Sequence, residues 1–234
     1  MSISIMQPYV FPYIGYFQLI YASDVFVFYD DVNFINRGWI NRNRILINGK
    51  DHLFTIPCLD ASQNKLIKDI EVLNNAKDLK KLLDTIQSAY KKAPQFNIVF
   101  QLIQSILEIK ENITISELAI KSILLITEYL ELKRDFKISS QNYTNQELKK
   151  ADRLIDICRL EGIEHYINAA GGKAIYTKEY YKNEGINLDF LIAEKYEYLQ
   201  FKNEFVPWLS IIDILMFNDK NTIINKILPA YHLE

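Results

Sequence analysis

Residues 32–50 carry four basic side chains and no acidic one, so this stretch has a local charge of +4. The four are Arg37, Arg42, Arg44 and Lys50. A guanidinium group can hold a phosphate through two parallel hydrogen bonds, so the stretch could bind a phosphorylated or nucleotide-linked ligand. The alternative is a solvated hairpin face whose arginines pair with Asp30 and Asp31.

An indole ring and two amides alternate with these arginines along the chain. If the segment is a strand, Trp39, Asn41 and Asn43 share one face of it. Arg42 and Arg44 then share the other face. We expect the indole to form a wall against a sugar or base, the amides to orient polar groups, and the guanidinium groups to hold phosphate.

A second candidate is the loop rich in proline and tyrosine within "QPYVFPYIGYFQLI", residues 7–20. Strands and helix interiors exclude proline, so the segment predicts a loop that leads into a helix. Its prolines restrict the unbound loop, and its tyrosines offer flat faces and catalytic hydroxyl groups. The alternative is a loop that packs under its neighbours. The expected site residues are Gln7, Pro8, Tyr9, Tyr13, Gly15 and Tyr16, with Tyr13 and Tyr16 catalytic.

Asp30 and Asp31 end a predicted strand and are the best candidates for a general base. Neighbouring residues of a strand point in opposite directions, so only one of the two is expected to face a ligand. Further along, "NAAGGKAIY" places two glycines between a strand and a helix, where backbone N–H groups can meet an anion. Its alternative is a plain turn, since neither the P-loop nor the GxGxxG spacing is present. From this segment we expect Asn168, Gly171 and Gly172 in the site.

Runs of β-branched and aromatic residues predict strands over residues 2–6, 24–31, 135–140, 163–168 and 186–192. Helices between them, one of them opened by a capping box of Thr144 and Glu147, predict crossovers and hence a parallel sheet. Ligands of such sheets bind beyond the carboxyl ends of the strands. Gln7, Asp30, Ser140 and Asn168 should therefore lie at one edge of the sheet.

Two insertions complete the expected architecture. Asn48-Gly49 between two apolar runs predicts a β-hairpin over residues 38–57, because both residues accept a positive φ. Helical periodicity predicts a helical layer over residues 75–132, with Thr114 and Glu117 as a capping box. We expect one α/β domain, residues 1–234, with a Rossmann-like, mostly parallel sheet of about five strands.

The composition bounds the classes of function. The 234 residues are 49% hydrophobic and carry a net charge of −2, which argues against a broad nucleic-acid footprint. Two cysteines and three histidines without metal-like spacing argue against a zinc site and favour a reducing compartment. We expect no metal, no membrane span and no signal peptide, and hence a cytoplasmic protein. Nothing in the sequence identifies a cofactor or an oligomeric state.

The segments "QPYVFPYIGYFQLI", "RGWINRNRI", "YINAAGGKAIY" and "LSIIDILMFN" resemble the WbqC-like proteins and follow that family's order. The resemblance covers nearly the whole chain. It implies a role in bacterial surface-polysaccharide (O-antigen) biosynthesis, with glycyl transfer to an amino sugar as a suggested activity. The family supplies no settled catalytic residues.

The opening segment is also similar, more weakly, to the strand–loop–HxGH–helix start of nucleotidylyl transferases and pantothenate synthetases. Tyr13 and Tyr16, on either side of Gly15, occupy the positions of the two histidines. Those histidines stabilise the phosphates of a nucleotide, whereas tyrosine carries no positive charge. This resemblance implies a Rossmann-like fold more than a reaction.

Together these features predict a transferase that acylates or aminoacylates a nucleotide-linked amino sugar. Asp30 or Asp31 would take the proton from the attacking amine. The alternatives are an ATP-using, adenylate-forming enzyme related to the nucleotidylyl transferases, and a sugar-binding or assembly protein without activity. The expected partner is a small sugar or nucleotide-sugar, with no nucleic acid.

Overall fold

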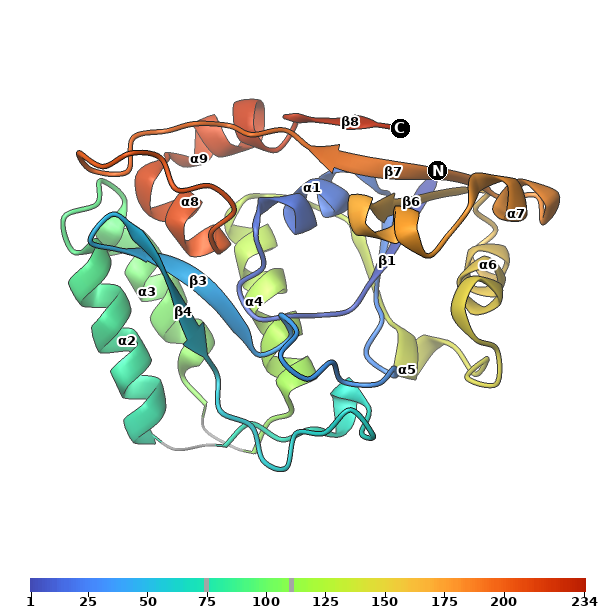
Figure 1. Ribbon diagram of the computed structural model, residues 1–234, viewed down its shortest axis with the longest axis horizontal. Helices are drawn as coiled ribbons and strands as arrows, with labels where there is room; N and C mark the ends of the chain where they lie inside the picture. Colours follow the sequence, from blue (N-terminus) through green and yellow to red (C-terminus); the bar gives the residue numbers. More distant parts are fainter. Residues whose placement is uncertain (74–75, 110–111) are drawn as a thin grey trace.

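The computed structural model describes residues 1–73, 76–109 and 112–234, and contains a six-stranded sheet in the order β5-β2-β1-β6-β7-β8 (Figure 1). The strands are β1 (Ser2–Met6), β2 (Val25–Phe28), β5 (Asp135–Ile138), β6 (His165–Ala169), β7 (Asn187–Ala193) and β8 (Tyr231–Leu233). The first five run parallel and β8 pairs antiparallel with β7. The predicted parallel sheet is confirmed. The sequence analysis missed β8, because three residues are too few to show a strand pattern.

The strand order reverses beside β1. The chain leaves β1 for β2 on one side, and it returns later to β6 on the other side. Ile3 therefore lies opposite Val25 in one neighbour and opposite Tyr166 in the other. Because β1, β2, β5 and β6 are parallel, the residues that follow them lie at one edge of the sheet, as predicted. In open α/β sheets this edge, at the point of reversal, is where ligands bind.

The helices, in chain order, are α1 (Ile14–Ala22), α2 (Ala76–Tyr90), α3 (Phe96–Leu107), α4 (Ile115–Tyr129), α5 (Ser139–Asn142), α6 (Lys150–Leu160), α7 (Lys178–Asn183), α8 (Ile211–Phe217) and α9 (Lys220–Thr222). Short turns of other helix types cover η1 (Ile67–Asp69), η2 (Ala170–Ala174) and η3 (Ile223–Ile227). Within the described ranges, no helix combines the length and the apolar character that a membrane span needs.

One of the two predicted capping boxes is present. Thr114 Oγ1 accepts from the Glu117 N–H at 3.2 Å, and Glu117 Oε2 accepts from the Thr114 N–H at 2.8 Å. The prediction of a capping box at Thr144 and Glu147 was wrong, because α6 begins only at Lys150. The preceding segment is held away from a helix by the Asn145 amide, which donates to Asp156 at 2.7 Å.

The hairpin consists of β3 (Arg42–Ile47) and β4 (Lys50–Thr55), and Asn48 and Gly49 have φ of 52° and 75° as predicted for a tight turn. The strand begins later than expected. Residues before Arg42 form turns, in which the Gly38 N–H donates to the Ile35 carbonyl at 2.9 Å. Side chains therefore alternate between the two faces of the strand only from Arg42 onward, and not from Trp39 as predicted.

Two cores cover the two faces of the sheet. Phe26 and Phe28 of β2 face a core that includes α1, the hairpin, α8 and the helical layer α2–α4. Ile3, Ile5 and Val27 face a second core with α6 and α7. In Figure 1 the hairpin is seen between α2 and α4 of the helical layer, and α6 and α7 lie at the opposite end of the view. The first core thus joins the hairpin to α1, and the loop after β1 passes between them.

Candidate functional site

Asp30 and Asp31, beyond the end of β2, both face the residues that follow β5. Asp30 accepts from the Ser140 N–H at 3.0 Å and from Ser140 Oγ at 2.7 Å. Ser139 Oγ donates to Asp31 and lies 3.3 Å from Asp30 Oδ1. The expectation that the two carboxylates point apart was wrong, because β2 ends at Phe28 and its alternation does not reach them.

A buried arginine forms an ion pair with Asp31, one of these two carboxylates. Arg153 of α6 places Nη2 2.5 Å from Asp31 Oδ2, and both side chains are buried. Its guanidinium also lies 4.8 Å from the centre of the Tyr29 ring and donates to Asn145 at 3.1 Å. Burial raises the pKa of Asp31, but hydrogen bonds from Arg153 and Ser139 outweigh burial and hold that pKa below its ordinary value. Asp31 is thus an ionised, fully engaged carboxylate and a poor general base.

Sequence reasoning missed Arg153. The alternative to phosphate binding paired the arginines of residues 32–50 with the two aspartates, but the partner of Asp31 comes from α6. The available signal was position: Arg153 directly precedes Leu154 and Ile155, both buried on α6. An arginine that is buried with such residues needs a partner for its charge.

Six side chains from three segments enclose a pocket of about 290 Å³. They are Tyr9 and Tyr13 of the loop after β1, Trp39, Asn43 and Arg44 of the hairpin segment, and Trp208 before α8. Five of the six are predicted site residues that lie far apart in the sequence. Trp208 was not predicted, since a lone tryptophan after a proline has no distinctive pattern.

Four of the six residues of this aromatic pocket, as we call the site, carry aromatic rings, and one pair of them meets edge to face. The rings of Tyr13 and Trp208 are 6.3 Å apart between centroids and inclined by 75°. The Arg44 guanidinium lies 5.4 Å from the centroid of Trp39. Burial raises the pKa of Tyr13, so at neutral pH its hydroxyl group stays protonated and can donate a hydrogen bond.

Arg44 is the cation of the pocket. Its Nη1 lies 3.2 Å from Asp51 in a partly exposed ion pair, while its Nε is buried and has no partner among the described groups. Arg42 instead donates from Nε to the Gly38 carbonyl at 2.6 Å, and Arg37 is exposed in a turn. The Arg42 guanidinium also lies over Trp39, 5.9 Å from the ring centroid, but of the basic residues in this stretch only Arg44 lines the pocket.

The hairpin amides hold backbone groups. Asn43 donates from Nδ2 to the Phe11 carbonyl at 2.7 Å, and its Oδ1 accepts from the Arg44 N–H at 2.8 Å. Asn41 donates to the Ile56 carbonyl at 2.8 Å. Each amide thus has backbone partners already, although Asn43 still lines the pocket. Their role as substrate contacts stays a prediction.

Ser210, which caps α8, joins the three walls of the pocket. Its N–H donates to the Arg44 carbonyl at 2.8 Å, and its Oγ donates to the Phe11 carbonyl at 2.8 Å. The next residue donates from its N–H to the Pro12 carbonyl at 2.9 Å. The hairpin, the loop after β1 and the start of α8 are thus fixed to one another within a few residues of Tyr13 and Trp208.

Tyr16 and Gly15 differ from expectation. Tyr16 is 1% exposed and packs on Tyr9 and Phe26, with its hydroxyl group unpaired, so it is a core residue. A Cβ on Gly15 would lie 2.5 Å from Cζ of Tyr13. Gly15 therefore makes room for the Tyr13 ring and not for the approach of a ligand.

The remaining predicted residues lie outside the pocket lining. Asn168 is buried, and its Oδ1 accepts from the Ala169 N–H at 2.8 Å. A Cβ on Gly172 would meet the Asn168 amide, whereas Gly171 has open space around it. Gln7 is half-buried and Pro8 buried at the end of β1.

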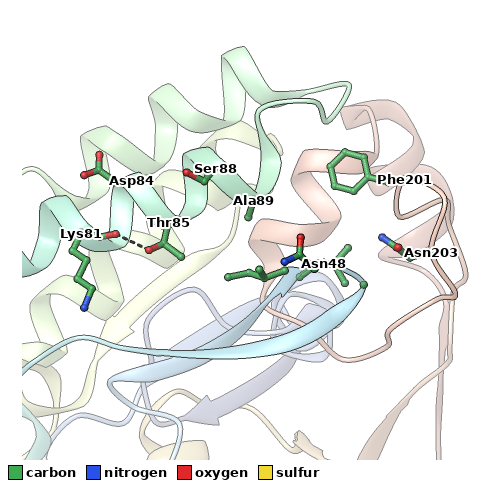
Figure 2. A pocket seen from close by; sticks show the side chains of 11 residues that line it. Asn48, Lys81, Asp84, Thr85, Ser88, Ala89, Phe201 and Asn203 are labelled. Atoms are coloured by element: carbon green, nitrogen blue, oxygen red, sulfur yellow. Dashed lines mark hydrogen bonds between the residues drawn. The ribbon is translucent and has the colours of Figure 1, made fainter.

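A larger hollow of about 620 Å³ lies at the other end of β3 (Figure 2). The hairpin turn, α2 and the segment around Phe201 form it. In Figure 2 the charged ends of Lys81 and Asp84 project toward different sides of α2. It contains no predicted site residue and no convergent set of polar groups, so we take the aromatic pocket as the candidate site.

Comparisons with known proteins identify relatives of the whole chain. A model of the WbqC-like protein family matches residues 7–225. A protein of Mycobacterium tuberculosis described as "Uncharacterized protein Rv1507c" is 25% identical over 218 residues, which cover 92% of each chain. No solved structure matches the chain.

Proposed function

The chain belongs to the WbqC-like protein family, and from this premise we propose that it is a transferase of bacterial surface-polysaccharide (O-antigen) biosynthesis. It acylates or aminoacylates a nucleotide-linked amino sugar, for example by glycyl transfer. The observation that carries the proposal is the aromatic pocket, where aromatic rings from three segments surround a single guanidinium group. The free thiols of Cys58 and Cys158 suit the cytoplasm, where we place the protein.

Within the pocket, each group has a role that its contacts allow. Arg44 holds a phosphate of the ligand through the N–H groups that Asp51 leaves available. Tyr13, kept protonated by burial, donates to the acyl oxygen as negative charge develops there. Asp30 and Asp31 hold the ends of β2 and β5 together and are not assigned to proton transfer.

Binding and turnover test the proposal separately. UDP- and dTDP-linked amino sugars are added to the protein, and the melting temperature and the binding heat are recorded. A ligand at 100 times its dissociation constant stabilises the folded state by about 2.7 kcal/mol. Incubation with an aminoacyl or acyl-CoA donor should then add the acyl mass to the amino sugar. If the protein binds none of these compounds and no mass increase is found, the proposed activity is excluded.

A second function is favoured by one observation: among the residues that the structure describes, no carboxylate lines the aromatic pocket. A transferase needs a group that accepts the amine proton, whereas a sugar-binding or assembly protein does not. The same assays separate the two, because a binding protein would give heat and stabilisation but no product. The adenylate-forming alternative is less well supported, since Tyr16, at one histidine position of the HxGH motif, is buried.

A further inference from the structure

Trp208 has an unusual backbone for a large side chain. Its φ is +59°, in the left-handed region that sterically disfavours residues with a Cβ. Its side chain is 41% exposed, so burial of the ring does not explain why the conformation is kept. Strained residues persist where the surroundings over-determine them, and they concentrate at ligand sites.

Both flanks of Trp208 are fixed. On one side, Ser210 is bonded to the hairpin and to the loop after β1, as described above. On the other side, Gln200 exchanges two hydrogen bonds with the backbone of Val206, at 2.7 and 3.0 Å. Gln200 in turn donates to the buried Asp213 carboxylate at 2.7 Å. The strap, residues 194–209, can therefore hold the indole at the pocket in the absence of a ligand.

The shape of the pocket indicates which part of a ligand it accepts. Its volume of about 290 Å³ is at the lower end for ligand pockets, so it holds one ring system and not a whole nucleotide-sugar. A flat base binds by stacking face to face on an aromatic ring. Here the Tyr13 and Trp208 rings cross at 75°, and the Arg42 and Arg44 guanidinium groups lie over Trp39. Crossed walls suit a puckered ring.

We propose that Trp208 is a specificity-determining residue that closes the aromatic pocket over a single pyranose ring. Arg44 then meets the phosphate on that ring, and the nucleoside lies outside the pocket. The ligand class in this inference, a nucleotide-linked amino sugar, comes from the proposed function. What the inference adds is the end of the ligand that is recognised and the role of Trp208, which lies outside the basic stretch and the loop after β1.

The chain offers a direct probe, because Trp39 and Trp208 are its two tryptophans and both line the pocket. The tryptophan emission of the unaltered protein is followed during titration with N-acetylglucosamine 1-phosphate, with UDP, and with UDP-N-acetylglucosamine. The part of each change that is missing in W208F is assigned to Trp208. The sugar phosphate and the nucleotide-sugar should change the emission saturably, whereas UDP should not. An equal change with UDP would place the base in the pocket and overturn the inference.

Calorimetry on W208G and W208F separates recognition from stability. Glycine accepts the positive φ but removes a ring that is more than half buried, so W208G should melt below the unaltered protein. Its affinity for N-acetylglucosamine 1-phosphate should fall at least tenfold, and W208F, which keeps a flat ring, should recover part of it. A merely structural role would leave the affinity of the folded W208G protein unchanged, which overturns the inference.

The outcomes distinguish the two proposals. If the unaltered protein binds UDP-N-acetylglucosamine and W208G binds it equally well, the inference fails and the proposed function stands. If the sugar phosphate binds at Trp208 but no nucleotide-sugar binds, the proposed function fails and the inference stands. If the unaltered protein binds none of the three probes, both fail.

Discussion

The guanidinium group of Arg153 lies 2.5 Å from the carboxylate of Asp31, although 122 residues separate them in the sequence. Both side chains are almost completely buried. The pair joins the end of β2 to α6, and so it fixes the edge of the sheet at which β1, β2 and β5 end.

Removal of this arginine should strongly destabilise the fold. Arg153→Met leaves the Asp31 charge buried without a partner, and such losses amount to about 3–5 kcal/mol. The matched control is Arg159→Met on the same helix, whose ion pair with Glu184 is half exposed and contributes roughly 0–1 kcal/mol. The free energy of unfolding in urea measures both. Equal effects of the two substitutions would contradict the importance of the buried pair.

The same pair should make stability depend on acid pH. The pKa of Asp31 is lower in the folded state than its ordinary value of about 3.9, so its stabilising contribution is complete above that pH. The contribution is lost as the pH falls further, through the folded-state pKa. The difference in unfolding free energy between the parent and Asp31→Asn should therefore stay constant from pH 7 down to about 4 and shrink below that pH. A difference that stays constant below about pH 4 would refute this assignment.

Removal of the hydroxyl group should have different effects at Tyr13 and at Tyr16. Tyr13→Phe should leave stability unchanged and weaken ligand binding or turnover, because this hydroxyl group is at the aromatic pocket. Tyr16→Phe serves as the control: its hydroxyl group is buried and unpaired, so its loss should be neutral or stabilising by up to about 1 kcal/mol. Thermal denaturation and calorimetry are the measurements. Normal binding and turnover by the double variant would rule out a role for either hydroxyl group.

Gly15→Ala should weaken ligand binding indirectly, because the new methyl group displaces the Tyr13 ring and does not contact the ligand. Alanine is favoured over glycine in helices by about 1 kcal/mol, but here the new Cβ would collide with the Tyr13 ring at 2.5 Å and displace it. Ligand affinity should fall. The control is Gly171→Ala, since nothing lies within 4 Å of the position of its Cβ. If calorimetry finds the same affinity for both variants, Tyr13 does not depend on Gly15.

The arginines of the hairpin segment should not be equivalent. Arg44→Ala should weaken the binding of a nucleotide-sugar or sugar phosphate by roughly 1.5–3 kcal/mol, the range for hydrogen bonds to charged groups. Arg37→Ala should have little effect, because Arg37 is exposed and does not line the pocket. Calorimetry at constant salt compares them. Unchanged affinity for Arg44→Ala would return the basic stretch to its alternative, a solvated hairpin face.

Features that depend on neighbours in the chain could be predicted from the sequence. The strands of the parallel sheet, the turn at Asn48 and Gly49, and the capping box of Thr114 and Glu117 are all encoded within a few residues. Hydrophobic periodicity and turn chemistry act over that range, so one sequence suffices to predict them. Five pocket residues, Tyr9, Tyr13, Trp39, Asn43 and Arg44, were predicted from unusual local composition and lie at one pocket.

Only the tertiary structure decided which of these residues meet. Tyr13 and Tyr16 are three positions apart in the same segment, yet Tyr13 lines the pocket and Tyr16 lies in the core. The packing of the surrounding elements, and not the spacing in the sequence, sets the exposure of each ring. Arg153 displaced the hairpin arginines as the partner of Asp31, and Trp208 joined residues nearly 200 positions earlier. Such contacts depend on how whole elements pack across the sheet. A buried charge or a ring finds its partner in space, and sequence distance places no restriction on that partner.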